Sequence, residues 1–139
     1  MQNPPVQTGS GDVTAKTALG LDANLGAALG YPVGILAIII FIMEKQNRFA
    51  RFHALQSILY HVGAVVVFIG LGILLFIIQL ILAQISSVLG LIAGLLWLVY
   101  LVAFLVYFAG LIFLAVKSYG GASTSLPVIG GMTEKILNK

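Results

Sequence analysis

The sequence contains no cysteine and very little charge. Asp, Glu, Lys and Arg make up only 8% of its 139 residues, whereas a soluble domain carries roughly 25%. The missing thiols exclude disulfides, thiolate catalysis and cysteine-ligated metal clusters. The missing charge leaves too few polar side chains to cover a surface that faces water. Because 60% of the residues are hydrophobic and the mean hydropathy is +1.12, lipid is the predicted solvent for most of the chain.

The basic residues are few and scattered. There are 7 Lys and Arg residues against 4 Asp and Glu residues, which gives a net charge of +3. A nucleic-acid-binding domain needs a dense basic face, so we expect no nucleic-acid partner. The sequence also offers no serine triad, carboxylate pair, phosphate-binding glycine loop or metal-ligand motif. We therefore expect a protein that is not an enzyme.

Three apolar runs follow a polar start. Residues 1–20 have the Pro, Gly, Ser and Thr content of a flexible polar tail. A helix that crosses a membrane needs about 20 apolar residues, and each of the three runs is that long. The runs cover about 24–43, 52–82 and 88–116.

This pattern predicts an all-α integral membrane protein with three transmembrane helices. The helices would form one domain over residues 21–119, and residues 120–139 would form a short interfacial segment at the C-terminus. The loop between the first two runs holds Lys45, Arg48 and Arg51, the next loop holds no charge, and lysines follow the third run. Basic loops face the cytoplasm, so we expect the inner membrane, with the N-terminus outside and the C-terminus inside.

Glycines recur at four-residue intervals in the first run, at Gly26, Gly30 and Gly34. In lipid, helices associate through close backbone approach, which glycine permits. The spacing predicts a packing face for another helix of this chain or of a partner.

Polar residues gather on one side of the second run. With about 100° per residue, His53, Gln56, Ser57, Tyr60 and His61 fall within an arc of about 140°. A polar group that faces lipid costs several kcal/mol, so this arc is expected to face protein, water or a bound molecule.

Three roles for the arc stay open. Its side chains could hydrogen-bond to other helices. Alternatively, His53 or His61 could ligate the iron of a haem or the magnesium of a chlorophyll; about 12 Å separates them along the helix, so they could not share one metal. Thirdly, the arc could line a proton or solute pathway.

We expect the first role, with Arg48 and Arg51 on lipid phosphates or an acidic partner. Together with His53, Gln56 and Ser57 they would tie the second helix to other helices or to the C-terminal segment. His53 would be the centre of this structural latch, because its ring can donate and accept at once.

Three stretches carry a resemblance to a known family: LGAALGYPVG, EKQNRFARFHALQSIL and LPVIGGMTEKI. From about Leu21 onward the chain resembles small bacterial and archaeal membrane proteins of unknown function that are grouped with Tic-twenty-like proteins. Those proteins are relatives of a translocon subunit of the chloroplast inner envelope. The resemblance implies a membrane scaffold and no reaction.

The expected function is therefore that of an accessory subunit in a larger membrane complex. Its partners would be lipids and other integral membrane subunits, with a photosynthetic or respiratory complex as the expected setting. A translocation component and a tetrapyrrole-binding subunit are the alternatives.

Overall fold

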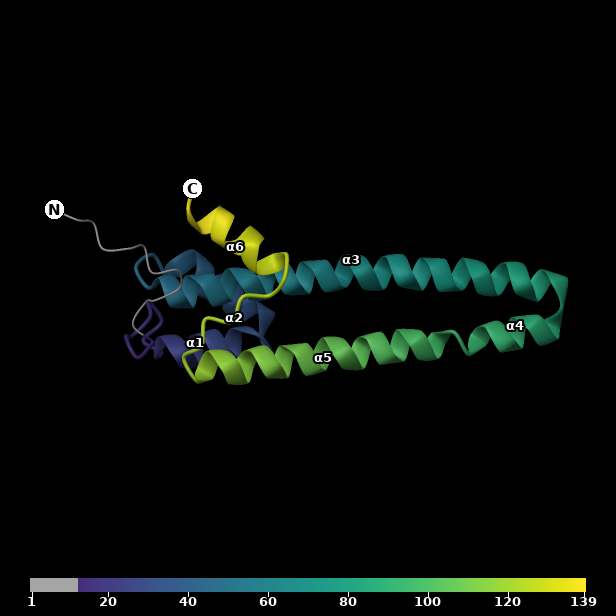
Figure 1. Cartoon of the computed structure of the whole chain (residues 1–139), viewed down its shortest axis with the longest axis horizontal. Coiled ribbons are helices and arrows are strands. Elements are labelled where there is room, and N and C mark those ends of the chain that lie inside the picture. The colour runs from purple at the N-terminus through teal and green to yellow at the C-terminus, as the bar shows by residue number, and fades with distance from the viewer. Residues whose placement is uncertain (1–12) are drawn as a thin grey trace. The chain divides into compact units, whose positions relative to one another are not determined.

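The computed structural model describes residues 13–139, and the part of the predicted tail at 1–12 lies outside them. The described residues form helices and no β-sheet, which confirms the all-helical class (Figure 1). Residues 13–22 form turns, closed by an isolated bridge between Lys16 and Asp22. The helices are α1 (Ala23–Gly30), α2 (Gly34–Met43), α3 (Arg48–Ile85), α4 (Ser87–Gly94), α5 (Trp97–Tyr119) and α6 (Ile129–Leu137).

The chain divides into two compact units. Unit 1 combines Met1–His61 with Leu111–Lys139, and unit 2 is Val62–Gly110. Unit 1 therefore holds α1, α2, α6, the start of α3 and the end of α5. Unit 2 holds the remainder of α3 and α5 together with α4.

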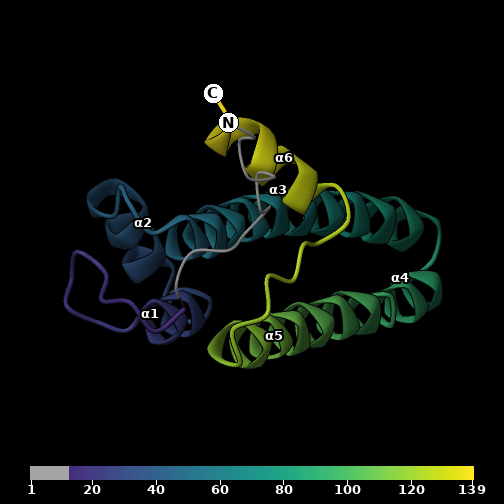
Figure 2. The ribbon, with the colours of Figure 1, turned by 60° about the vertical axis from the view of Figure 1, so that its left-hand side comes forward.

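The first apolar run is two short helices instead of one span. α1 has 8 residues and α2 has 10, and residues 31–33 separate them (Figure 2). Pro32 and Val33 mark the break, because proline lacks the N–H of a helical hydrogen bond and Val33, at φ −116° and ψ 82°, lies outside helical geometry. At 1.5 Å per residue neither helix approaches the ~30 Å hydrocarbon core. Three spans are thus not confirmed.

α1 and α2 pack against each other in unit 1. A Cβ placed on Gly26 would lie 3.3 Å from Cδ1 of Ile40, and one on Gly30 would lie 3.4 Å from Cβ of Ala37. The order of these contacts makes the two helices antiparallel. Small buried residues dominate the core around them, which consists of Ala23, Ala27, Ala37, Ile40, Phe49, Ala50 and Ala54.

Two helical segments are long and apolar enough to cross a membrane. They are Arg48–Ile85, which is α3, and Ser87–Tyr119, which comprises α4, a turn at residues 95–96, and α5. The predicted runs 52–82 and 88–116 fall inside them. In unit 2 the ring of Phe68 packs against Tyr100, Phe104 and Tyr107, with centroid distances of 5.3, 5.9 and 5.8 Å. Most large apolar side chains of this unit are exposed.

Candidate functional site: a buried polar cluster in unit 1

Four polar side chains lie together in the interior of unit 1. His53, Gln56 and Ser57 come from the first turns of α3, and Tyr31 comes from the break between α1 and α2. Each has an exposed fraction of 0%. Buried polar groups are stable only when they are hydrogen-bonded, so the partners of these four residues decide what the polar cluster does.

Gln56 joins three separate segments of the chain. Its Nε2 donates to the Tyr31 hydroxyl at 2.9 Å and to the backbone carbonyl of Thr124 at 2.9 Å. Its Oε1 accepts from the backbone N–H of Leu126 at 3.1 Å. Both donor hydrogens and the acceptor of the amide are in use. Through this one side chain, α3 is attached to the α1–α2 break and to the segment between α5 and α6.

The same bonds fix the protonation pattern of the cluster. The Leu126 N–H can only donate, so Oε1 of Gln56 must face it and Nε2 must face Tyr31. The Tyr31 hydroxyl then accepts from Gln56 and donates to Nδ1 of His53, 2.9 Å away. With Nδ1 as an acceptor, a neutral His53 carries its proton on Nε2.

His53 is enclosed by aromatic rings. Tyr31, Phe49 and Phe52 pack edge-on around it, with centroid distances of 5.9, 4.5 and 5.3 Å. Its Nε2 is buried and makes no hydrogen bond in the described chain, while the backbone of Ala122 acts on it electrostatically. One ring nitrogen is thus occupied and the other is enclosed. This arrangement offers no exposed nitrogen for the iron or magnesium of a tetrapyrrole.

Ser57 and His61 extend the cluster toward α1 and α2. The Ser57 hydroxyl donates to the carbonyl of Gly30 at 2.8 Å, and so pairs one of the carbonyls that the end of α1 leaves unpaired. Nδ1 of His61 lies 2.8 Å from the carbonyl of Ser57, and only a protonated Nδ1 can bond there. His61 is half-buried, and a Cβ on Gly34 would lie 3.5 Å from its Nε2.

The three predicted glycines do not share one helix face. Gly26 and Gly30 lie on α1 against α2, whereas Gly34 begins α2 and faces His61. The break at Pro32 separates Gly34 from the other two. The partner of the glycine face is thus found within the chain.

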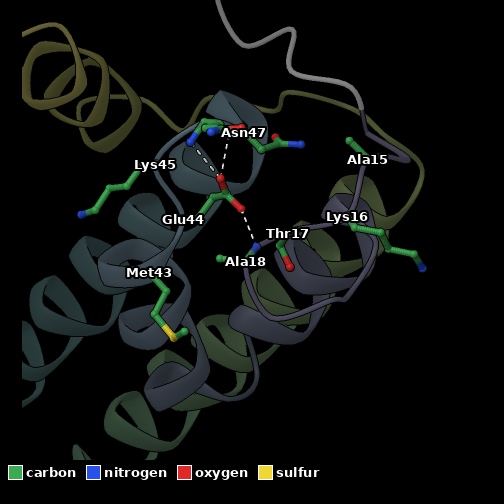
Figure 3. A pocket seen from close by; sticks show the side chains of 9 residues that line it. Ala15, Lys16, Thr17, Ala18, Met43, Glu44, Lys45 and Asn47 are labelled. Carbon is green, nitrogen blue, oxygen red and sulfur yellow. Dashed lines mark hydrogen bonds between the residues drawn. The ribbon is translucent and has the colours of Figure 1, made fainter.

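A buried carboxylate organises the loop before α3. Glu44 is 4% exposed, and it accepts hydrogen bonds from the backbone N–H groups of Ala18 at 2.8 Å and of Gln46 and Asn47 at 2.9 Å (Figure 3). Desolvation raises the pKa of this carboxyl, but the backbone hydrogen bonds together outweigh it and hold the pKa below its ordinary value. Asn47 caps α3, because its Oδ1 accepts from the N–H of Ala50 at 3.0 Å.

The two predicted arginines lie beside the cluster rather than in it. Nη2 of Arg48 donates to Oδ1 of Asn138 at 2.7 Å, which connects the start of α3 to the end of α6. The guanidinium of Arg51 lies over the ring of Phe41, 5.5 Å from its centroid. Within residues 13–139 neither arginine is paired with a carboxylate.

Sequence reasoning missed Tyr31, Glu44 and the backbone groups of the segment after α5. A signal existed for the loop, since an Asn just before a helix is a common cap. Tyr31 could have been singled out as a polar group within an apolar run. The backbone partners at Thr124 and Leu126 have no side-chain signature.

Comparison with known proteins finds a family model that matches most of the chain. Residues 15–132 match the model described as the magnetosome magnetite crystal formation protein family. A UPF0132 membrane protein of Methanocaldococcus jannaschii is 49% identical over 45 residues, which is 32% of this chain and 41% of that protein. The chain thus aligns with about two fifths of the length of this relative. No solved structure matches the chain.

The family match corrects the resemblance to Tic-twenty-like proteins, which was wrong. That resemblance rested on short motifs within apolar helices. Its most distinctive residues, at 51–57, include His53, Gln56 and Ser57, which build the interior of unit 1. Residues of this kind report how a helix packs, and they carry little information about which family it belongs to.

Proposed function

Because the chain belongs to the magnetosome magnetite crystal formation protein family, we propose that it is a small integral membrane protein with a structural, non-enzymatic role where magnetite crystals form. The family match over residues 15–132 carries this proposal. It replaces the expected photosynthetic or respiratory complex and the translocon, which neither comparison supports. The tetrapyrrole alternative, through His53 or His61, has no support from either comparison.

The chemistry of the polar cluster supports a structural role. The Gln56 amide and the Ser57 hydroxyl are used in bonds to the chain's own backbone and to Tyr31. A catalytic group needs a free donor or acceptor that can reach a substrate. Side chains whose donors are spent on internal bonds hold segments in place instead. In this proposal, unit 1 is the rigid end of a membrane scaffold.

The distribution of charge supports two membrane crossings. All 7 Lys and Arg residues and all 4 Asp and Glu residues lie outside Val62–Gly110. The part of α3 in unit 2, residues 62–85, is about 36 Å long, enough for the ~30 Å hydrocarbon core. The start of α3 and the end of α5 both belong to unit 1. This proposal thus departs from the three-span expectation, because it puts residues 13–30 and 120–139 on one side, the cytoplasmic side by the positive-inside rule.

The proposal is tested in a magnetite-forming bacterium whose own family member has been deleted. The full chain is expressed there, and crystal dimensions are measured by electron microscopy. We expect the chain to co-purify with crystal-bearing membrane and to restore crystal size or number. The variant Gln56→Leu should restore less, because unit 1 loses its central bonds. A chain that inserts normally into that membrane and leaves the crystals of the deletion strain unchanged would refute the proposed role.

A further inference from the structure

A pocket of unit 1 is lined by cations. It has a volume of about 220 Å³ and is bounded by Lys45, Gln46, Arg48, Arg51 and Leu137. No carboxylate lines it, and no ion pair involves its three cations in the described part of the chain. The nearby Glu44 carboxylate is engaged with three backbone N–H groups. Three like charges around one space repel each other, so an anion bound there would be stabilised.

The guanidinium groups at this pocket are held in place before any ligand binds. Arg48 is fixed by its bond to Asn138, and Arg51 by its contact with Phe41. Nε of Arg51 is buried and has no hydrogen-bond partner within residues 13–139. An unpaired buried donor is destabilising, and an acceptor oxygen that reached it would relieve this cost. The pocket also lies at the start of α3, where the helix dipole adds positive potential.

We propose that Lys45, Arg48 and Arg51 bind the phosphate of an anionic lipid headgroup. Arginine presents a planar fork that matches two phosphate oxygens, and lysine adds a mobile charge at the rim. The exposed apolar side of α2 ends directly before Lys45; Ile35 is 72% exposed and Ile42 is 61% exposed. Acyl chains lying along this side would bring a headgroup to the pocket. A headgroup site goes beyond the proposed structural role, which requires none.

Native mass spectrometry of the full chain in neutral detergent tests the site. The probes are phosphatidylglycerol, phosphatidylcholine and inorganic phosphate. The test variant carries Lys45→Gln, Arg48→Gln and Arg51→Gln together. The matched control is Lys117→Gln, which removes an exposed cation of unit 1 that does not line the pocket. Lys45→Gln alone is a second test, because this side chain is exposed and its substitution leaves no buried group without a partner. Circular dichroism checks that every variant stays helical.

We expect phosphatidylglycerol to bind the unaltered chain and Lys117→Gln equally, and to bind the triple variant about tenfold more weakly. Lys45→Gln should show a smaller loss. Phosphatidylcholine should bind more weakly to all forms, and inorganic phosphate should compete with phosphatidylglycerol. Equal binding of phosphatidylglycerol by the triple variant and the control would overturn the site. Binding of inorganic phosphate without phosphatidylglycerol would overturn the lipid as its source. These readouts are independent of crystal formation, so their failure differs from failure of the proposed function.

Discussion

The contacts inside unit 1 differ in kind from the contacts inside unit 2. In unit 1, hydrogen bonds between buried polar groups connect segments far apart in sequence, as Gln56 does with Thr124 and Leu126. In unit 2, aromatic rings pack around Phe68, and the hydrogen bond from Trp97 to Gln79 at 2.7 Å joins its two helical segments.

The difference follows from the solvent that each unit is suited to. Unit 2 exposes large apolar side chains and carries no formal charge, so it needs lipid around it. Lipid gives little hydrophobic drive for helices to associate, so van der Waals packing must hold this unit. Unit 1 contains the charged residues, and hydrogen bonds between specific partners hold its segments together. A substitution of the same kind should thus have different effects in the two units.

The largest expected effect concerns the side of the membrane on which unit 1 lies and the side on which the connection between α3 and α4 lies. The chain lacks cysteine, so single cysteines report accessibility cleanly. Thr14→Cys and Ser125→Cys in unit 1 should react with an impermeant thiol reagent from the same side, and Ser87→Cys in unit 2 from the opposite side. Labelling of each variant is measured in right-side-out and in inside-out membrane vesicles. Labelling of Thr14→Cys and Ser125→Cys from opposite sides would restore the three-span arrangement.

The next effect compares two glutamines. Gln56→Leu should lower the free energy of unfolding by about 3 kcal/mol, because it removes three hydrogen bonds, one from the buried Tyr31 hydroxyl and two from the part-buried backbone of Thr124 and Leu126. Gln79→Leu in unit 2 loses one bond and should cost about 0.6 kcal/mol. Thermal unfolding in detergent measures both.

Limited proteolysis of residues 120–139 adds a local readout to this comparison. Cleavage should increase strongly in Gln56→Leu, which loses two hydrogen bonds to that segment, and less in His53→Leu, whose link to the segment is the backbone of Ala122. Stronger cleavage in His53→Leu than in Gln56→Leu would place the centre of the latch at His53, as the sequence suggested. Equal unfolding of Gln56→Leu and Gln79→Leu would remove the distinction between the two units.

The smallest expected effect is a pH dependence confined to unit 1. The pKa of Glu44 is lower in the folded chain than its ordinary value. Its contribution to stability is thus fully present above the ordinary pKa and is lost as pH falls through the lowered pKa. At neutral pH, Glu44→Gln should have a lower free energy of unfolding than the unaltered chain. Its free energy of unfolding should also fall less as the pH is lowered. If both proteins show the same slope of stability with pH, Glu44 does not act as inferred.

Part of this architecture could be predicted from the sequence. Hydropathy gave the helical class and located the two long helices, because apolar runs in lipid have few alternatives to helix. The periodicity also put His53, Gln56 and Ser57 on one side of α3. Pro32 carried a signal for the break, because proline commonly ends a helix just before it. The spacing of Gly26 and Gly30 did not show that α1 and α2 fold onto each other there.

Other features had no signature in the sequence. Thr124 and Leu126 contribute backbone groups, which every residue has, so their pairing with Gln56 depends on how the chain returns to unit 1. The buried Glu44 likewise depends on Ala18, 26 residues away. Helical periodicity describes one element at a time, and it cannot identify a partner contributed by another segment.

The bonds of Gln56 also impose an order on biosynthesis. Its partners Thr124 and Leu126 follow it by 68 and 70 residues, whereas Tyr31 precedes it by 25. While the ribosome is still making α5, the nascent chain can already form the contacts of Tyr31 with His53 and Gln56. The amide oxygen of Gln56 has no backbone partner until residue 126 emerges. Unit 1 therefore closes last, after the two long apolar segments have been synthesised.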